Sequence, residues 1–212
     1  MQTSNLQKVD KRKFPIAGAL GSILIVLLFC STAHASPWKF SEIRNSTHSF
    51  LLGFTTGYMT HEVGHVLVAK TKGYSVELDG PSLVYPDLDE GTLDQLHIAT
   101  AGFQAQWLVS EAALRYRENR RLSDCENNFN AGLVMFHLAT TVAYMTFLKD
   151  HEQGDTVGAA KATGLSTDQV ALLAAIPALL DGWRLFAEDP PAWVPALSAG
   201  TKGLGIFAIW SY

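Results

Sequence analysis

Two histidines and a glutamate in the segment His61-Glu62-Val63-Gly64-His65 have the spacing that zinc chemistry requires. On a helix, residues four apart lie on one face, about 6 Å apart along the axis. Both imidazoles can then reach one tetrahedral Zn²⁺ at roughly 2.0–2.1 Å. Glu62 lies beside the metal, where its carboxylate can take a proton from zinc-activated water and return it to a leaving amine. We therefore predict one zinc ion held by His61 and His65, with Glu62 as the catalytic base.

A catalytic zinc site needs a third protein ligand. The metzincin class is excluded, because Val68 and Thr71 occupy the positions where that pattern has Gly and His. A thermolysin-like site would take a glutamate from a following helix, and Glu111 is the candidate. An aspartate further along the chain, Asp181, is the other main candidate, and His97 is a further alternative.

The composition favours a membrane protein. Hydrophobic residues make up 48% of the 212 residues and charged residues only 17%, against about 25% charged in ordinary soluble domains. The net charge is −4 and no long basic block occurs, which argues against nucleic acid as a partner. Two cysteines, Cys30 and Cys125, do not make a disulfide framework.

The amino terminus has the order of a secretory signal. A basic lead from Lys8 to Lys13 precedes the apolar run Ile16 to Cys30, and small residues in an A-x-A arrangement end at Ala35. We interpret residues 1–35 as a signal peptide or signal anchor. Residues 36–212 are then expected to form a single membrane metallopeptidase-like domain, and the protein is expected to be an integral membrane protein.

The remaining pattern predicts a mainly α fold: a polytopic membrane helical bundle with a small β-hairpin after the metal-binding helix. About four or five hydrophobic helices are expected. Phe129 to Leu148 is the cleanest span, since it lacks Asp, Glu, Lys and Arg and contains one histidine, His137, interpreted as a buried hydrogen-bonded residue or, alternatively, a group near the site. The other expected segments are helices at Ser49–Lys70 and Leu93–Arg115, a strand–turn–strand unit at Tyr74–Tyr85, a small polar stretch at Glu152–Ser166, and apolar segments at Val170–Phe186 and Trp193–Tyr212.

The metal motif and its surroundings resemble the site-2 protease family of intramembrane zinc metalloproteases. His61 to Ala69, followed by Gly73 and the hairpin, is similar to that family's metal-binding helix. Ala99-Thr100-Ala101-Gly102-Phe103 is similar to a small-residue helix that follows the hairpin there. Leu180-Asp181-Gly182, with Pro177 upstream, resembles the family's second motif, although the usual asparagine and double proline are missing and Arg184 follows. The resemblance implies that Asp181 is the third zinc ligand.

These features together predict a zinc-dependent membrane endopeptidase that hydrolyses peptide bonds in or near the bilayer. Its partners would be a membrane-associated protein or peptide substrate and the lipid bilayer itself. The hairpin Tyr74–Tyr85 could present a strand edge to an extended substrate. Two alternatives remain open: a non-catalytic metal-binding membrane protein, and a soluble secreted thermolysin-like metallopeptidase that uses Glu111.

Overall fold

The structure, a computed structural model, describes residues 36–80 and 82–212. The predicted signal segment 1–35 and Pro81 of the predicted turn lie outside the described residues. The elements in chain order are the 3₁₀ helix η1 (Phe40–Asn45), the helix α2 (Thr47–Thr71), the strands β1 (Glu77–Asp79) and β2 (Ser82–Val84), and the helices α3 (Leu93–Asn119), α4 (Asp124–Thr146), α5 (Asp155–Thr163), α6 (Thr167–Phe186) and α7 (Trp193–Ser211).

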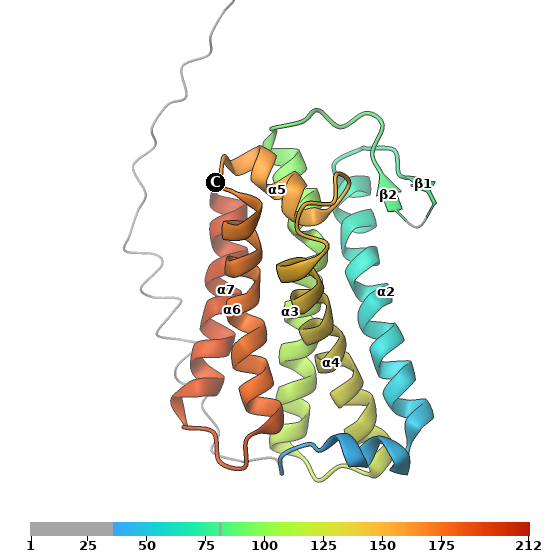
Figure 1. Cartoon of the computed structure of the whole chain (residues 1–212), viewed down its shortest axis with the longest axis vertical. Coiled ribbons are helices and arrows are strands. Elements are labelled where there is room, and N and C mark those ends of the chain that lie inside the picture. Colours follow the sequence, from blue (N-terminus) through green and yellow to red (C-terminus); the bar gives the residue numbers. More distant parts are fainter. Residues whose placement is uncertain (1–35, 81) are drawn as a thin grey trace, which may run out of the picture.

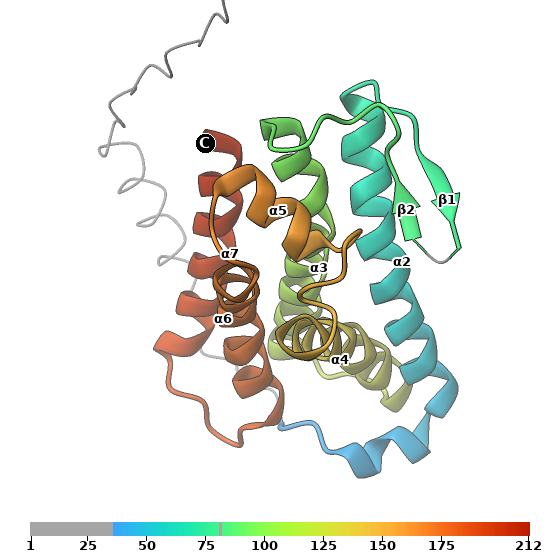
Figure 2. The same cartoon turned by 45° about the horizontal axis from the view of Figure 1, so that its top comes forward.

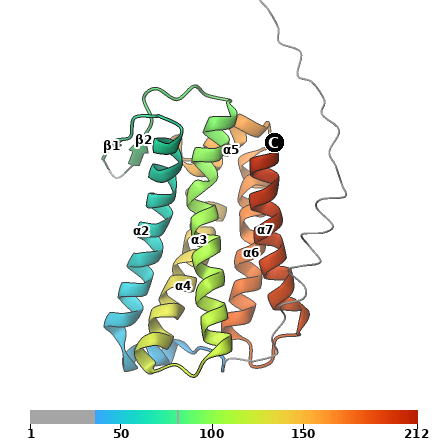
Figure 3. The same ribbon diagram turned by 180° about the vertical axis from the view of Figure 1, so that it is seen from behind.

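The long helices run side by side as a bundle (Figures 1 and 3). Helices α3 and α4 lie in its middle, with α2 on one flank and the pair α6 and α7 on the other. The short α5 and the hairpin lie at the same end of the bundle (Figure 2). The prediction of a mainly helical fold with a small hairpin after the metal-binding helix is confirmed.

Local signals in the sequence explain where the middle helices begin. Thr92 accepts a hydrogen bond from the Gln95 amide at the start of α3. Ser123 and Ser166 form capping boxes with Glu126 and Gln169 at the starts of α4 and α6. Such caps satisfy amide groups that have no partner within the helix.

Helix α2 buries small and polar residues and exposes large apolar ones. Its buried positions recur every four residues: Ser49, Gly53, Gly57, His61, His65 and Ala69. A Cβ atom at Gly53 would collide with the Phe129 backbone of α4, so glycine allows these two helices to touch. The opposite surface of α2 presents Leu51, Leu52, Met59, Val63 and Leu67, each at least half exposed. This distribution is the reverse of a helix on the surface of a water-soluble domain.

Helices α6 and α7 have the same reversed distribution. The buried side of α6 is rich in alanine and carries Asp181 and Arg184, while α7 buries Val194, Ser198 and Lys202. Large apolar side chains of both helices are exposed: Leu172, Leu173, Leu179, Trp183, Trp193, Leu204, Phe207 and Trp210.

Length and hydropathy identify fewer candidate membrane-spanning helices than the sequence predicted. Among the described residues, α6 is the one helix that is long and apolar enough to cross a membrane, with a mean hydropathy of 1.3 in its best window, 44% of which is buried. The segment expected to be the cleanest span, Phe129–Leu148, lies mostly in α4, which starts earlier in a polar stretch that includes Asn127, Asn128 and Asn130. The polytopic arrangement therefore stays a prediction.

A short helix forms where the sequence predicted only a small, polar stretch. Helix α5 starts after Gly154 and carries Asp155 in its first turn. It ends at Gly164, whose φ of 75° lies in the left-handed region that favours glycine at a helix end. Asp155 of this helix belongs to the candidate metal site.

Candidate metal centre

The two motif histidines of α2 point into the bundle, and α3 fixes the orientation of both rings. Nδ1 of His65 donates to the carbonyl oxygen of Ile98 at 2.7 Å. Nδ1 of His61 lies 3.0 Å from the amide oxygen of Gln106. With Nδ1 as the donor in both rings, Nε2 is the nitrogen that would give up its proton when a metal binds.

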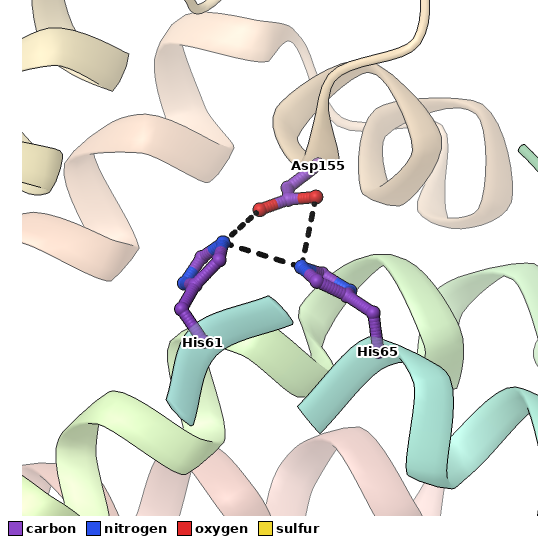
Figure 4. Close-up of side chains that lie close together, drawn as sticks. All are labelled: His61, His65 and Asp155. Carbon is purple, nitrogen blue, oxygen red and sulfur yellow. Dashed lines mark hydrogen bonds and ion pairs between the residues drawn. The ribbon is translucent and has the colours of Figure 1, made fainter. Parts of the chain in front are cut away.

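Asp155 completes a three-residue group with these histidines, as Figure 4 shows. Oδ2 of Asp155 lies 3.0 Å from Nε2 of His61, and Oδ1 lies 3.3 Å from Nε2 of His65. The two Nε2 atoms are 3.2 Å apart. Ligands at about 2.1 Å around a tetrahedral zinc are separated by roughly 3.4 Å, so these three residues fit the edges of such a site. We call His61, His65 and Asp155 the metal cluster.

The charge of Asp155 suits a metal ligand. Burial by itself would raise the pKa of the Asp155 carboxyl, but the neighbouring His65 and His61 rings, through charge and hydrogen bonds, hold that pKa well below its usual range. The carboxylate is therefore ionised at neutral pH, as coordination requires.

Gly102 of α3 forms one wall of the metal cluster. A Cβ atom built at this position would lie 2.6 Å from Nε2 of His61 and closer still to Nε2 of His65. Any side chain here would occupy the space where the metal and its ligands meet. The small-residue stretch Ala99 to Phe103 noted in the sequence thus lies directly against the motif histidines.

A cavity of about 520 Å³ opens onto the metal cluster. Glu62 lines it together with both histidines and Asp155, so the predicted base and the metal cluster face one space. Strand β2 and Tyr85 line another part of its wall. Burial, with the Asp155 and Glu62 carboxylates, raises the pKa of Tyr85, which keeps its phenol protonated and able to donate a hydrogen bond.

Asp181, which the family resemblance implied as the third zinc ligand, has other partners in the structure, and Asp155 is the carboxylate beside the histidines. The Asp181 carboxylate is fully buried and accepts hydrogen bonds from Ser110 at 2.8 Å, Ser198 at 2.5 Å and Lys202 at 2.7 Å. These donors occupy both of its oxygens. In addition, α3 and α4 lie between α6 and the metal-binding helix α2 (Figure 1).

The other candidate ligands also lie elsewhere. Glu111 pairs with Lys202 at 2.9 Å, with Arg184 at 2.7 Å and with Arg115 at 2.7 Å. His97 stacks on Trp210, with ring centroids 4.2 Å apart, and its Nε2 lies 3.2 Å from the Ile209 carbonyl oxygen. The thermolysin-like alternative based on Glu111 therefore has no support in this geometry.

Sequence reasoning missed Asp155, and the reason is physical. An acidic residue in the first turn of a helix is common, because it interacts favourably with the helix dipole. Gly154 and Gly164, which bound a nine-residue segment, were the available signal that a helix starts at Asp155. Nothing in that local signal indicates that α5 packs across the end of α3 towards His61, 94 residues earlier.

No protein-family model, no curated protein and no solved structure matches this chain.

Proposed function

We propose that this chain is a zinc-dependent endopeptidase that works at or within a lipid bilayer. The observation that carries the proposal is the metal cluster with Glu62 in the same cavity. Two histidines and one carboxylate as ligands, with a second carboxylate beside them, are one of the donor sets that support metal-assisted hydrolysis.

Each residue has a defined task in this reaction. His61, His65 and Asp155 would hold the zinc, which when bound lowers the pKa of water and polarises a carbonyl group. Glu62 takes a proton from the attacking water and returns it to the departing amine. Tyr85, with its protonated phenol at the cavity wall, can donate a hydrogen bond to the oxygen on which charge develops.

A peptide is the substrate that fits the cavity wall. Strand β2 pairs with β1 along one edge, with Leu83 opposite Leu78. Ser82, Leu83 and Val84 also line the cavity, and the edge of β2 away from β1 has no strand partner among the described residues. An extended peptide can add to such an edge through main-chain hydrogen bonds, which places its backbone near Glu62.

The reversed polarity of α2, α6 and α7 supports a bilayer environment. Exposed leucine, phenylalanine and tryptophan side chains on three helices make an apolar exterior, while small and polar residues face the interior. Membrane helices pack through small residues and keep ionisable groups inside the bundle, as these helices do.

The test is to replace Glu62 by Gln in the full chain and to measure zinc content and cleavage of an unstructured model protein such as casein. We expect zinc to be retained and kcat to fall by at least about 100-fold, because a general base is worth roughly 10²–10⁴ in rate. Glu152→Gln is the matched control, since Glu152 lines the same cavity but is outside the motif. Undiminished cleavage by Glu62→Gln would contradict the proposal.

A further inference from the structure

Two polar stripes run through the bundle from the metal cluster to Asp181. On α4, Tyr144, Thr141 and His137 lie three and four residues apart and so share one face. The Tyr144 hydroxyl donates to Oδ2 of Asp155 at 2.9 Å, and Nε2 of His137 lies 3.7 Å from Oδ2 of Asp181. The stripe thus spans about 10 Å along the helix axis.

The second stripe lies on α3. Gln106 holds Nδ1 of His61 through its amide oxygen, and Ser110, one turn further along, donates to Oδ2 of Asp181. Both stripes therefore begin at a member of the metal cluster and end at the same carboxylate.

The middle of both stripes contains buried polar atoms that lack hydrogen-bond partners. Among the described residues these atoms are Nε2 of Gln106, Oγ1 of Thr141 and both ring nitrogens of His137. His137 is fully buried, and Thr141 and Gln106 are nearly so. Leaving such groups unpaired is destabilising, and buried water normally satisfies them.

Among the buried helical threonines that the structure describes, Thr100 and Thr156 donate to carbonyl oxygens, whereas the Thr141 hydroxyl has no partner. Thr56, Thr60, Thr100, Thr146 and Thr163 each donate to the carbonyl oxygen four residues earlier. The Thr141 hydroxyl makes no such bond, although it is buried on the stripe beside His137.

We propose that Gln106, Thr141 and His137 bind a file of ordered water molecules between the metal cluster and Asp181. Water on Nε2 of Gln106 fixes the amide orientation in which its oxygen faces Nδ1 of His61. That orientation keeps Nε2 of His61 free for the metal. These residues are thus positioning residues for His61, and this role rests on the proposed zinc site.

The proposed file of water molecules ends at Asp181, which belongs to a buried ion-pair network. Asp181 binds Lys202, which also binds Glu111, and Arg184 joins Glu111 to Glu118. Glu118 lines a polar cavity of about 570 Å³ together with Arg117 and Arg121. The interior of the bundle therefore holds polar groups from the metal cluster to a second, solvent-accessible cavity.

The experiment uses the full-length zinc-loaded protein labelled with ¹⁵N-histidine, and compares Thr141→Val with Thr146→Val. We expect water-to-ring cross-relaxation at His137, and we expect it to be lost in Thr141→Val. We also expect that variant to bind zinc about 10-fold more weakly in a chelator competition, as for other outer-shell partners. Thr146, exposed on the same helix, should change neither measurement.

The result that would contradict the proposal is a buried stripe without ordered water. A dry stripe gives no water signal at His137, and Thr141→Val then raises the melting temperature without affecting zinc, because a methyl group replaces an unpaired hydroxyl. That outcome overturns the proposal. Thr141→Ser keeps the hydroxyl and should restore both signals if Thr141→Val folds poorly. Neither measurement depends on cleavage, so failure of the proposed protease activity would be seen separately.

Discussion

At the scale of single residues, the identity of the third ligand separates two interpretations of this chain. The motif histidines alone leave a zinc site incomplete, and the structure offers Asp155 on α5 where the family resemblance implied Asp181 on α6. The two aspartates have different partners: histidine nitrogens for Asp155, and serine and lysine donors for Asp181.

We expect Asp155→Asn to weaken zinc binding by more than the roughly 10–100-fold typical of an outer-shell change, because a charged ligand is lost. Asp181→Asn should keep zinc affinity while lowering stability. Both can be measured by chelator competition on purified protein. Zinc lost from Asp181→Asn and kept by Asp155→Asn would restore the original assignment.

Gly102 offers a steric test of the same site. Gly102→Ala should abolish zinc binding, since the new methyl group would overlap the Nε2 atoms of both histidines. Gly200→Ala is the matched control, because Gly200 lies in a helix and a Cβ there meets nothing within 4 Å. Bound zinc, measured by atomic emission, should be absent in the first variant and unchanged in the second. Full zinc occupancy in Gly102→Ala would show that the metal lies elsewhere.

At the scale of elements, a buried ion-pair network links α7 to α3 and α6. Lys202 is 4% exposed at its side chain and bridges Asp181 of α6 to Glu111 of α3. Helix α7 is also held at its other end, where Trp210 stacks on His97 and donates to the Gln104 amide oxygen at 2.8 Å.

Lys202→Met should therefore destabilise the protein by about 3–5 kcal/mol, the usual cost of leaving a buried charge without its partner. Lys161→Met is the control: Lys161 pairs with Glu90 at 2.6 Å, but both groups are well exposed, so its loss should cost less than about 1 kcal/mol. Denaturant or thermal unfolding in detergent measures both. Equal free energies of unfolding for Lys202→Met and Lys161→Met would mean that the buried ion pairs make no net contribution to stability.

At the scale of the whole molecule, the apolar exterior predicts that the chain partitions into membranes. We expect the chain to stay with membranes after alkaline carbonate extraction, because the exposed faces of α2, α6 and α7 would otherwise be in contact with water. Release into the soluble fraction would contradict the bilayer proposal and would leave the metal cluster untouched.

The sequence alone was enough to predict the helices and the hairpin that depend on local sequence pattern. The helix that carries both motif histidines, expected at Ser49–Lys70, is α2 at Thr47–Thr71, and the hairpin falls inside Tyr74–Tyr85. The histidine spacing alone placed both rings on one face. Asp155 could not be found in this way, because its role depends on the packing of a short polar helix whose own sequence has the pattern of an ordinary helix start.

Tertiary packing likewise decided the role of Asp181. Its tripeptide with Leu180 and Gly182 resembles a ligand motif, but Lys202, a single cation inside an apolar segment, is its partner in the bundle. A charge that is costly in an apolar helix needs a counter-charge, and in this structure Asp181 supplies it to Lys202.

The distance along the chain between His61 and Asp155 bears on when the metal cluster can form during synthesis. The two are 94 residues apart, and α3 and α4 are made between them. During synthesis, α2 emerges with two of the three ligands, and the third follows only after both central helices exist. A chain that stops before residue 155 has both motif histidines and Glu62 but no complete ligand set. The order of synthesis therefore completes the metal cluster after α3 and α4, and before α6 and α7, have been made.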